Sequence, residues 1–160
     1  MNNQWSENID EFIRLANHHD VQMIMVGGGA VNFHGYQRHS ADVDFWIKTD
    51  DENLSRLVLV FNEMNYEIQS FPQEVKDQKQ NISVKFSPSE LHLELITKFS
   101  SNRTFEEALA NSEKVEISGE KILKWNVLSY PDLIDSKLNA KRPKDLLDIQ
   151  QLEKINNKKG

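Results

Sequence analysis

Two aspartates in one short segment are the first residues of this sequence that could do chemistry. Asp42 and Asp44 stand two positions apart in a largely apolar stretch. Residues at i and i+2 of a β-strand point to the same face, so we expect the two carboxylates to lie side by side. Carboxylates held that close repel each other unless a cation lies between them. The pattern indicates Mg²⁺, which prefers carboxylate oxygens and bridges them to phosphates.

A glycine turn precedes this pair and could hold those phosphates. Gly27, Gly28 and Gly29 follow an apolar run and lead into a helical pattern. Such a turn presents free N–H groups to an anion. The triplet is not a dinucleotide fingerprint, because Asn32 stands at the last glycine position, and no P-loop lysine follows. Taken alone, the triplet is more simply explained as a tight turn without a ligand.

A third carboxylate falls on a later predicted strand. In the segment 91–96, His92 and Glu94 share one face and the leucines take the other. A charge among leucines is costly without a partner, and a shared metal ion would supply one. The alternative is a solvated outer face on which Glu94 pairs with a lysine such as Lys85. We favour the metal ion, because two other acids already need the same cation.

The composition limits the class of protein. The chain has 160 residues, 38% of them hydrophobic and 28% charged, and it has no cysteine. These values are typical of a globular protein without disulfides or thiolate metal sites. No apolar run reaches the length of a membrane span, and the N-terminus does not resemble a signal peptide. We therefore expect a cytoplasmic protein that does not interact with membranes.

The charge is unevenly distributed along the chain. Residues 1–120 hold ten Lys or Arg against twenty Asp or Glu, a net of −10, and residues 121–160 hold nine against five, a net of +4. An acidic protein is a poor general binder of nucleic acid. The basic tail could close over one phosphorylated ligand, but a solvated helix with ordinary surface lysines explains it equally well.

Hydrophobic periodicity predicts an α+β domain with a mixed sheet. Helices are expected at 5–18, 28–35, 50–65, 105–111, 129–140 and 144–155. Strands are expected at 22–26, 42–47, 66–71, 82–86, 91–96, 115–117 and 122–127, with a polar loop at 72–80. We treat residues 1–160 as a single domain with a core at about 20–100 and a C-terminal helical part at about 104–156.

The order and spacing of the motifs resemble the DNA polymerase beta-like nucleotidyltransferase superfamily. Gly27-Gly28 is followed, after thirteen intervening residues, by Asp42-Val43-Asp44-Phe45. In that superfamily a Gly-Gly or Gly-Ser turn precedes an Asp-x-Asp strand, and a later strand supplies a third acid. The segments 26–44 and 133–148 are similar to small bacterial nucleotidyltransferases, including minimal nucleotidyltransferases and relatives of abortive-infection toxins. The resemblance covers roughly residues 20–155.

The resemblance implies a nucleotidyltransferase fold whose C-terminal helices close the cleft. The implied reaction is an Mg²⁺-dependent transfer of a nucleoside monophosphate from an NTP, such as ATP, to a hydroxyl. Asp42 and Asp44 would bind two Mg²⁺ ions, and Glu94 would join them and aid deprotonation of the attacking hydroxyl. It also implies that Gly27 and Gly28 would hold the triphosphate and that Lys137, on the penultimate helix, would contact phosphates.

Four more residues complete the set of candidates. Ser40 stands where a threonine is usual in that superfamily and keeps the hydroxyl, so we count it among the nucleotide-binding residues. Arg38 could touch a phosphate, although a surface ion pair explains it as well. Arg142 or Lys144 could face the cleft beside the C-terminal helices. Glu94 stands where Asp is common in the superfamily, so its side chain reaches one methylene further.

The sequence leaves the acceptor open between a tRNA end, a protein side chain and a small molecule. A second hypothesis comes from a different functional class. The chain could be a non-catalytic protein that uses this fold to bind a nucleotide or a partner, for example as one half of a toxin–antitoxin pair. The intact pair of Asp42 and Asp44 argues against it, since a pure binder would not need to crowd two carboxylates.

Overall fold

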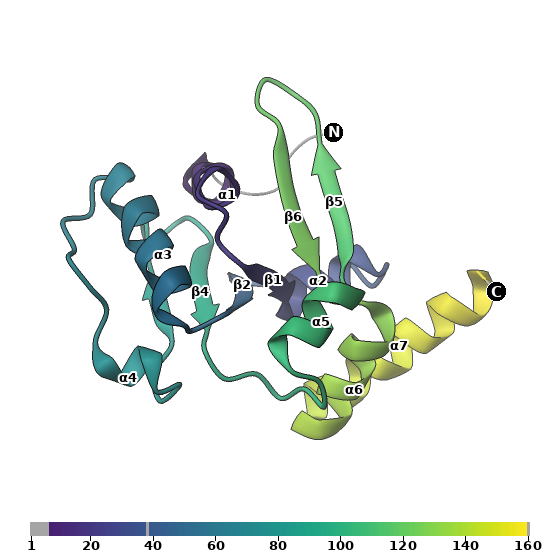
Figure 1. The fold of residues 1–160 in the computed structure, drawn as a ribbon. Coiled ribbons are helices and arrows are strands. Elements are labelled where there is room, and N and C mark those ends of the chain that lie inside the picture. The colour runs from purple at the N-terminus through teal and green to yellow at the C-terminus, as the bar shows by residue number, and fades with distance from the viewer. Residues whose placement is uncertain (1–6, 38, 160) are drawn as a thin grey trace.

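The computed structural model describes residues 7–37 and 39–159 and shows an open sheet with helices on both faces (Figure 1). The sheet formed by these residues has the strand order β3-β4-β2-β1-β6-β5. The strands are β1 (Met23–Val26), β2 (Asp42–Ile47), β3 (Ile82–Val84), β4 (His92–Ile96), β5 (Glu113–Ile117) and β6 (Leu123–Val127). The helices are α1 (Glu7–His18), α2 (Gly27–Phe33), α3 (Asp51–Glu63), α4 (Gln73–Lys76), α5 (Phe105–Asn111), α6 (Tyr130–Ala140) and α7 (Pro143–Lys159). The predicted α+β class with a mixed sheet is confirmed.

Strand β2 lies in the middle of the sheet and has neighbours of both directions. It is antiparallel to β1 and parallel to β4. Strand β1 also pairs with β6 in parallel, and the edge strands β3 and β5 are antiparallel to their neighbours. The turn of the β5–β6 hairpin projects beyond the rest of the sheet, and β6 packs against α1 (Figure 1). A central position fixes both flanks of β2, and therefore the directions of its side chains.

Helices α1 and α3 cover one face of the sheet. The apolar stripe of α1 is fully buried, and Phe12 from that stripe packs between Phe45 of β2 and Phe61 of α3, at ring distances of 6.1 and 5.7 Å. Helix α3 begins where the Asp50 side chain accepts a hydrogen bond from the Asn53 N–H, which is a typical N-cap. None of the helices within residues 7–37 and 39–159 combines the length and the apolar character that a membrane span requires.

The opposite face carries the even-numbered side chains of β2. Trp46 on this face lies 5.2 Å from the ring of Phe99 and 5.2 Å from that of Phe105, so α5 and the loop before it cover the sheet there. The C-terminal helices α6 and α7 form a hairpin at one end of the molecule (Figure 1). Helix α6 begins at the N-cap Ser129, and Lys141 ends it in a left-handed conformation with φ 55°.

Two sequence predictions between α3 and β3 are wrong. Residues 66–71 form no strand, and the predicted loop 72–80 contains the short helix α4. The segment 66–71 is held against α3 instead, because the side chain of Asn62 bonds both the N–H and the carbonyl of Ile68. A side chain that satisfies the backbone in this way replaces a neighbouring strand. The predicted helix 5–18 is observed from Glu7, and its first two residues lie outside the described part of the chain.

Candidate functional site

The sheet register brings the three predicted carboxylates to one region. Asp42 is paired with His92, and Asp44 is paired with Glu94, across the parallel strands β2 and β4. Residues paired across neighbouring strands point to the same face, and such strands lie about 4.8 Å apart. Asp42, Asp44 and Glu94, which we call the carboxylate site, therefore share one face of the sheet. Trp46 lies on the same face, further along β2.

Two of these acids have defined neighbours. The Asp42 carboxylate lies 3.6 Å from Nδ1 of His92. The Glu94 carboxylate accepts a hydrogen bond of 2.6 Å from the hydroxyl of Ser83 on β3. Glu94 thus bonds to Ser83, and not to Lys85, which the alternative interpretation of the sequence offered as its partner. The alternation Ile82-Ser83-Val84 was the available signal for Ser83, because it sets the serine on the face opposite its apolar neighbours.

Both the donor atoms of the carboxylate site and the register of its two strands suit a hard divalent cation. Carboxylate oxygens are the ligands that Mg²⁺ selects, and the paired positions set them on adjacent strands. In this conformation the side chains are held apart. Among the described residues, no three His, Asp or Glu side chains are gathered closely enough to hold a metal ion. Glu94 would have to turn away from Ser83 to join the two aspartates.

The glycine turn lies directly against Asp44. Val26 is paired with Asp44 across the antiparallel strands, and Gly27 follows it at φ +63°. A Cβ added to Gly27 would lie 2.2 Å from Oδ2 of Asp44. The absence of a side chain there lets the backbone of the turn approach the carboxylate. Only glycine combines that contact with a left-handed backbone at little cost.

Ser40 supports the second glycine of the turn and the start of β2. A Cβ on Gly28 would lie 2.8 Å from the Ser40 side chain, so the two backbones pack closely. The Ser40 hydroxyl donates a hydrogen bond of 3.0 Å to the carbonyl of Asp42. Ser40 therefore orders the segment between the turn and the aspartates. Arg38, another predicted nucleotide-binding residue, lies outside the described residues.

Lys137 is buried between α6 and α7. Its ammonium lies 2.7 Å from Asp148 and 3.4 Å from Asp145, and all three side chains are almost fully enclosed. The resemblance assigned Lys137 a direct phosphate contact. In the structure its charge is directed at two aspartates of α7, which sequence spacing did not reveal. The phosphate contact of Lys137 stays a prediction.

Arg142 extends this cluster to the surface. Its guanidinium bonds both oxygens of Asp145, at 2.6 and 3.1 Å. Burial would raise the pKa of Asp145, but the hydrogen bonds from Arg142 and the charge of Lys137 outweigh it, and the pKa lies below its ordinary value. The hydrogen bond to Asp145 raises the pKa of Arg142, and the charge of Asp44 adds to that rise. Arg142 therefore lies within electrostatic reach of the carboxylate site.

Comparison with known families identifies the family of this chain. The model of a family described as "Nucleotidyltransferase of unknown function (DUF6036)" matches residues 6–158. The chain belongs to this family. The nucleotidyltransferase family membership confirms the resemblance and accords with the mixed sheet. A search of curated proteins found no match.

Proposed function

We propose that this member of the nucleotidyltransferase family transfers a nucleoside monophosphate from an NTP to a hydroxyl, with Mg²⁺ as cofactor. The observation that carries the proposal is the pairing of Asp44 with Glu94 on one flank and the close approach of Gly27 on the other. Strand β2 thereby has a carboxylate of β4 on one side of Asp44 and the glycine turn on the other. The carboxylates suit a divalent cation, and the glycine turn suits a phosphate.

Each residue has a role in the proposed reaction. Asp42 and Asp44 hold the metal ions, and the Gly27–Gly28 turn accommodates the triphosphate. Bound Mg²⁺ at such a site neutralises charge on the reacting phosphate and favours ionisation of the attacking hydroxyl. That oxygen forms a bond to the α-phosphorus while the bond to pyrophosphate breaks. Glu94 accepts the hydroxyl proton.

The hydrogen bond from Ser83 defines the position of Glu94 before the proposed reaction. A hydroxyl donates to Oε2 of Glu94 at 2.6 Å, so this carboxylate accepts a hydrogen bond from an alcohol in its present surroundings. An acceptor hydroxyl would take the place of Ser83. Candidate acceptors are a tRNA end, a protein side chain and a small molecule, in a cytoplasmic setting that supplies NTP and Mg²⁺.

The test is transfer of label from each of the four α-labelled NTPs to tRNA, to protein and to a small-molecule extract, with Mg²⁺ or with EDTA. We expect transfer that needs Mg²⁺ and falls at least about a hundredfold in Asp44→Asn, because removal of a metal ligand removes electrostatic stabilisation of the transition state. Asp51→Asn is the matched control, since Asp51 is an exposed acid of α3 that pairs with Lys76.

The outcome separates the two functional classes. If Asp44→Asn transfers label as well as the wild type does, the carboxylate site takes no part in the reaction. Stabilisation of the wild type by Mg²⁺ and NTP in a thermal melt, without any transferred label, would favour the non-catalytic hypothesis. A nucleotide-binding half of a toxin–antitoxin pair would behave in that way.

A further inference from the structure

A hydroxyl of the protein itself bonds the third member of the carboxylate site. Ser83 of β3 donates to Oε2 of Glu94, and the two oxygens lie 2.6 Å apart. That distance is typical of a hydroxyl that donates to an ionised carboxylate, a stronger bond than one between neutral groups. In the reaction proposed above, Glu94 accepts the proton of the attacking hydroxyl. Ser83 is therefore already bonded to the group that an acceptor hydroxyl must reach.

The sheet register aligns Ser83 with the other groups of the site. Ser83 is paired with Glu94 across β3 and β4, and Glu94 is paired with Asp44 across β4 and β2. Asp44 is paired in turn with Val26 of β1, and Gly27 of the glycine turn follows. Neighbouring strands lie about 4.8 Å apart, so these groups form one continuous row. The order along the row is hydroxyl, carboxylate, carboxylate and glycine turn.

Ser83 is also accessible to a nucleotide. Its side chain is exposed, and β3 is an edge strand of the sheet that the described residues form. Its neighbours Ile82 and Val84 pack against the core, so Ser83 points to the opposite face, which bears the carboxylates. A nucleotide attached to Ser83 would therefore project from the surface of the sheet and leave the core unchanged.

Both ends of the β3–β4 hairpin are anchored, which keeps Ser83 in this register. At the turn, the side-chain amide of Asn8 donates to both carboxylate oxygens of Glu90, at 3.3 and 3.2 Å. At the open end, the N–H of the buried Thr97 donates to the side chain of Asn81 at 3.0 Å. The contact between β3 and β4 thus belongs to an ordered part of the molecule.

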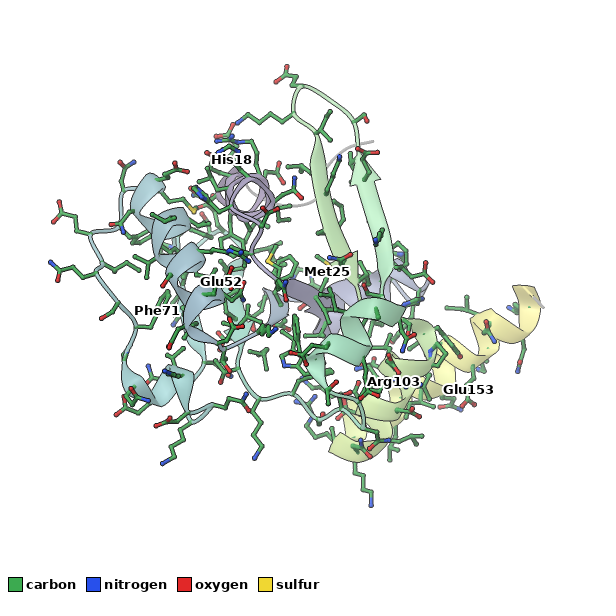
Figure 2. The ribbon with its side chains drawn as sticks, in the orientation of Figure 1. His18, Met25, Glu52, Phe71, Arg103 and Glu153 are labelled. Atoms are coloured by element: carbon green, nitrogen blue, oxygen red, sulfur yellow. The ribbon has the colours of Figure 1, made fainter. Side chains whose placement is uncertain are left out.

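Strand β4 is fixed on either side of Glu94 as well. Before it, the N–H of His92 donates to the carbonyl of Ala41 at 3.0 Å. After it, Arg103 in the loop between β4 and α5 pairs with the buried Asp132 of α6 at 2.6 Å (Figure 2). The position of the Glu94 backbone relative to the aspartates is therefore well defined.

The hydroxyl of Ser40, which lies beside the start of β2, has a different kind of partner. Ser40 donates to the backbone carbonyl of Asp42 at 3.0 Å. A carbonyl oxygen does not take up the proton that an attacking hydroxyl must lose, whereas a carboxylate does. A nucleophile is recognised by a base within hydrogen-bond reach, and by contacts that orient the base. Of these two serines, Ser83 meets that requirement.

We propose that Ser83 is a nucleotide acceptor of this protein and is modified by the carboxylate site of its own chain. This inference rests on the proposed function. The Ser83 oxygen forms a bond to the α-phosphorus of the NTP while the bond to pyrophosphate breaks, and the hydroxyl proton passes to Glu94. The products are pyrophosphate and a phosphodiester that joins Ser83 to the nucleoside. The attached nucleotide then fills the acceptor position beside Glu94, so each chain reacts once.

Mass spectrometry of the intact chain measures this modification directly. The mass of the purified full chain is recorded before and after incubation with Mg²⁺ and each of the four NTPs. With at least one NTP, we expect the fully reacted chain to carry one NMP, a gain of one NMP less one water, and no second NMP. Trypsin then releases residues 80–85, in which Ser83 is the only hydroxyl side chain, whereas Ser40 falls in the separate peptide 39–48.

Four variants make the result specific. Ser83→Ala should lose the adduct from peptide 80–85 and still bind an α,β-methylene NTP with Mg²⁺ within about twofold of the wild type by calorimetry. Ser83→Thr keeps a hydroxyl and suits a strand, so it should still be modified on this peptide. Glu94→Gln should slow the modification at least about a hundredfold, because it removes the general base. Ser89→Ala, the matched control, removes an exposed serine of the turn between β3 and β4 and should react like the wild type.

The remaining outcomes separate the inference from the proposed function. Modification within one chain requires a rate constant that does not depend on protein concentration. A rate constant proportional to concentration, an adduct on another residue, or an unchanged adduct yield in Ser83→Ala overturns the inference alone. Transfer of label to tRNA or to a small molecule without any adduct on the chain does the same. If Ser83→Ala does not bind the NTP, peptide 80–85 of the wild type and of Ser83→Thr still decides. A wild type that gains no adduct and labels no acceptor overturns both.

Discussion

Charged side chains lie at both ends of strand β2, but the charges of their neighbours differ between the two ends. At the first end, Asp42 and Asp44 lie beside a third acid of the same sign, Glu94. At the second end, Lys48 and Asp50 attract each other, with the Lys48 ammonium 3.5 Å from Asp50 and 3.2 Å from Glu106. Three acids share one face at the first end, with His92 beside Asp42 and Ser83 beside Glu94, whereas at the second end a lysine is paired with two acids.

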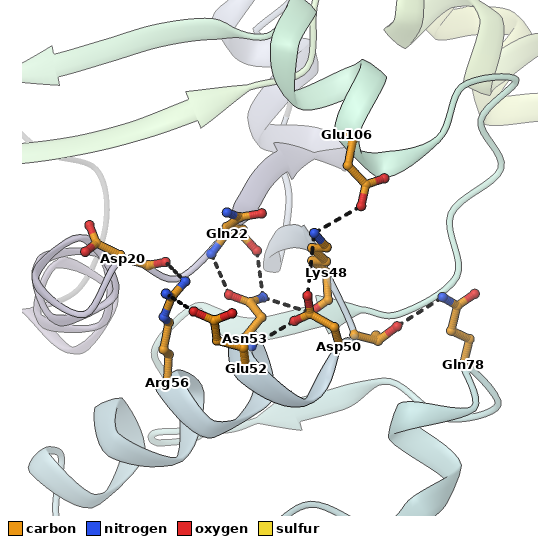
Figure 3. Close-up of polar contacts among 10 residues, drawn as sticks. Asp20, Gln22, Lys48, Asp50, Glu52, Asn53, Arg56, Gln78 and Glu106 are labelled. Carbon is orange, nitrogen blue, oxygen red and sulfur yellow. Dashed lines mark hydrogen bonds and ion pairs between the residues drawn. The ribbon is translucent and has the colours of Figure 1, made fainter.

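The second end is a connected set of polar contacts, which we call the Lys48 network: Gln22, Lys48, Asp50, Asn53 and Glu106 (Figure 3). Asn53 is 1% exposed, and its amide bonds the N–H and the carbonyl of Gln22 and the carbonyl of Lys48. These bonds join α3 to the start of β1 and to the end of β2. The network satisfies its own members and therefore contributes stability.

The carboxylate site is arranged differently, because three acids share one face of the sheet there, and bringing their carboxylates together is unfavourable without a cation. Natural structures tolerate such unfavourable local arrangements mainly at functional sites. The contrast between the two ends of β2 thus supports a bound cation at the first end and a structural role for the second. It also predicts that substitutions at the Lys48 network change stability, whereas substitutions at the carboxylate site change binding and activity.

The largest change in stability is expected for Asn53→Ala. It leaves three backbone groups without their partner and should lower the free energy of unfolding by about 2–4 kcal/mol. Urea denaturation measures this loss. Asn62→Ala is the matched control, since Asn62 lies on the same helix and also bonds backbone groups, but is exposed to water. If Asn53→Ala lowers the free energy of unfolding no more than Asn62→Ala does, the Lys48 network does not have the structural role assigned to it.

Gly27→Ala should have an intermediate effect. The new Cβ would overlap Oδ2 of Asp44 and occupy a left-handed backbone, which costs about 1–2 kcal/mol. Displacement of Asp44 should also reduce Mg²⁺-dependent nucleotide binding. Gly119→Ala is the control, because a Cβ there lies 4.0 Å from its nearest neighbour, and its stability should stay within about 0.5 kcal/mol of the wild type. Wild-type stability and nucleotide binding in Gly27→Ala would show that the close contact is unimportant.

The smallest effect is expected for Glu106→Gln, and it depends on pH. A backbone hydrogen bond and the hydrogen bond from Lys48 lower the pKa of Glu106 in the folded protein. Its contribution to stability is therefore present above the unfolded pKa of about 4.3 and is lost as the pH falls through the lower folded value. Urea midpoints should differ slightly between wild type and variant at pH 7 and coincide at low pH. A difference that grows on acidification would contradict the assignment.

Much of the sheet and of the carboxylate site follows from local sequence patterns. The alternation around Asp42 and Asp44, and that around Glu94, predicts which faces these side chains take. The pairing of Asp44 with Glu94 does not follow, because strand order depends on contacts between segments about fifty residues apart. The apolar residues of 66–71 suggested a strand, but a side chain of α3 satisfies the backbone there instead.

The environment of Lys137 was beyond prediction for a related reason. Its partners lie on α7, beyond the turn where Lys141 has a left-handed backbone. Whether Asp145 and Asp148 face Lys137 or solvent depends on how α7 packs against α6 after that turn. Sequence spacing shows that the three charges are near in the chain. It does not show that they are buried together.

Replacement of Mg²⁺ by paramagnetic Mn²⁺ tests most directly which end of β2 binds the cation. Mn²⁺ prefers the same oxygen ligands and broadens nearby backbone amide signals in NMR spectra. We predict that substoichiometric Mn²⁺ with NTP broadens the signals of residues 26–28, 42–44 and 92–94 and spares those of Lys48 and Glu106. Asp44→Asn should abolish the effect. Broadening centred on Lys48 and Glu106, or unchanged in Asp44→Asn, would contradict the assignment of the cation to the carboxylate site.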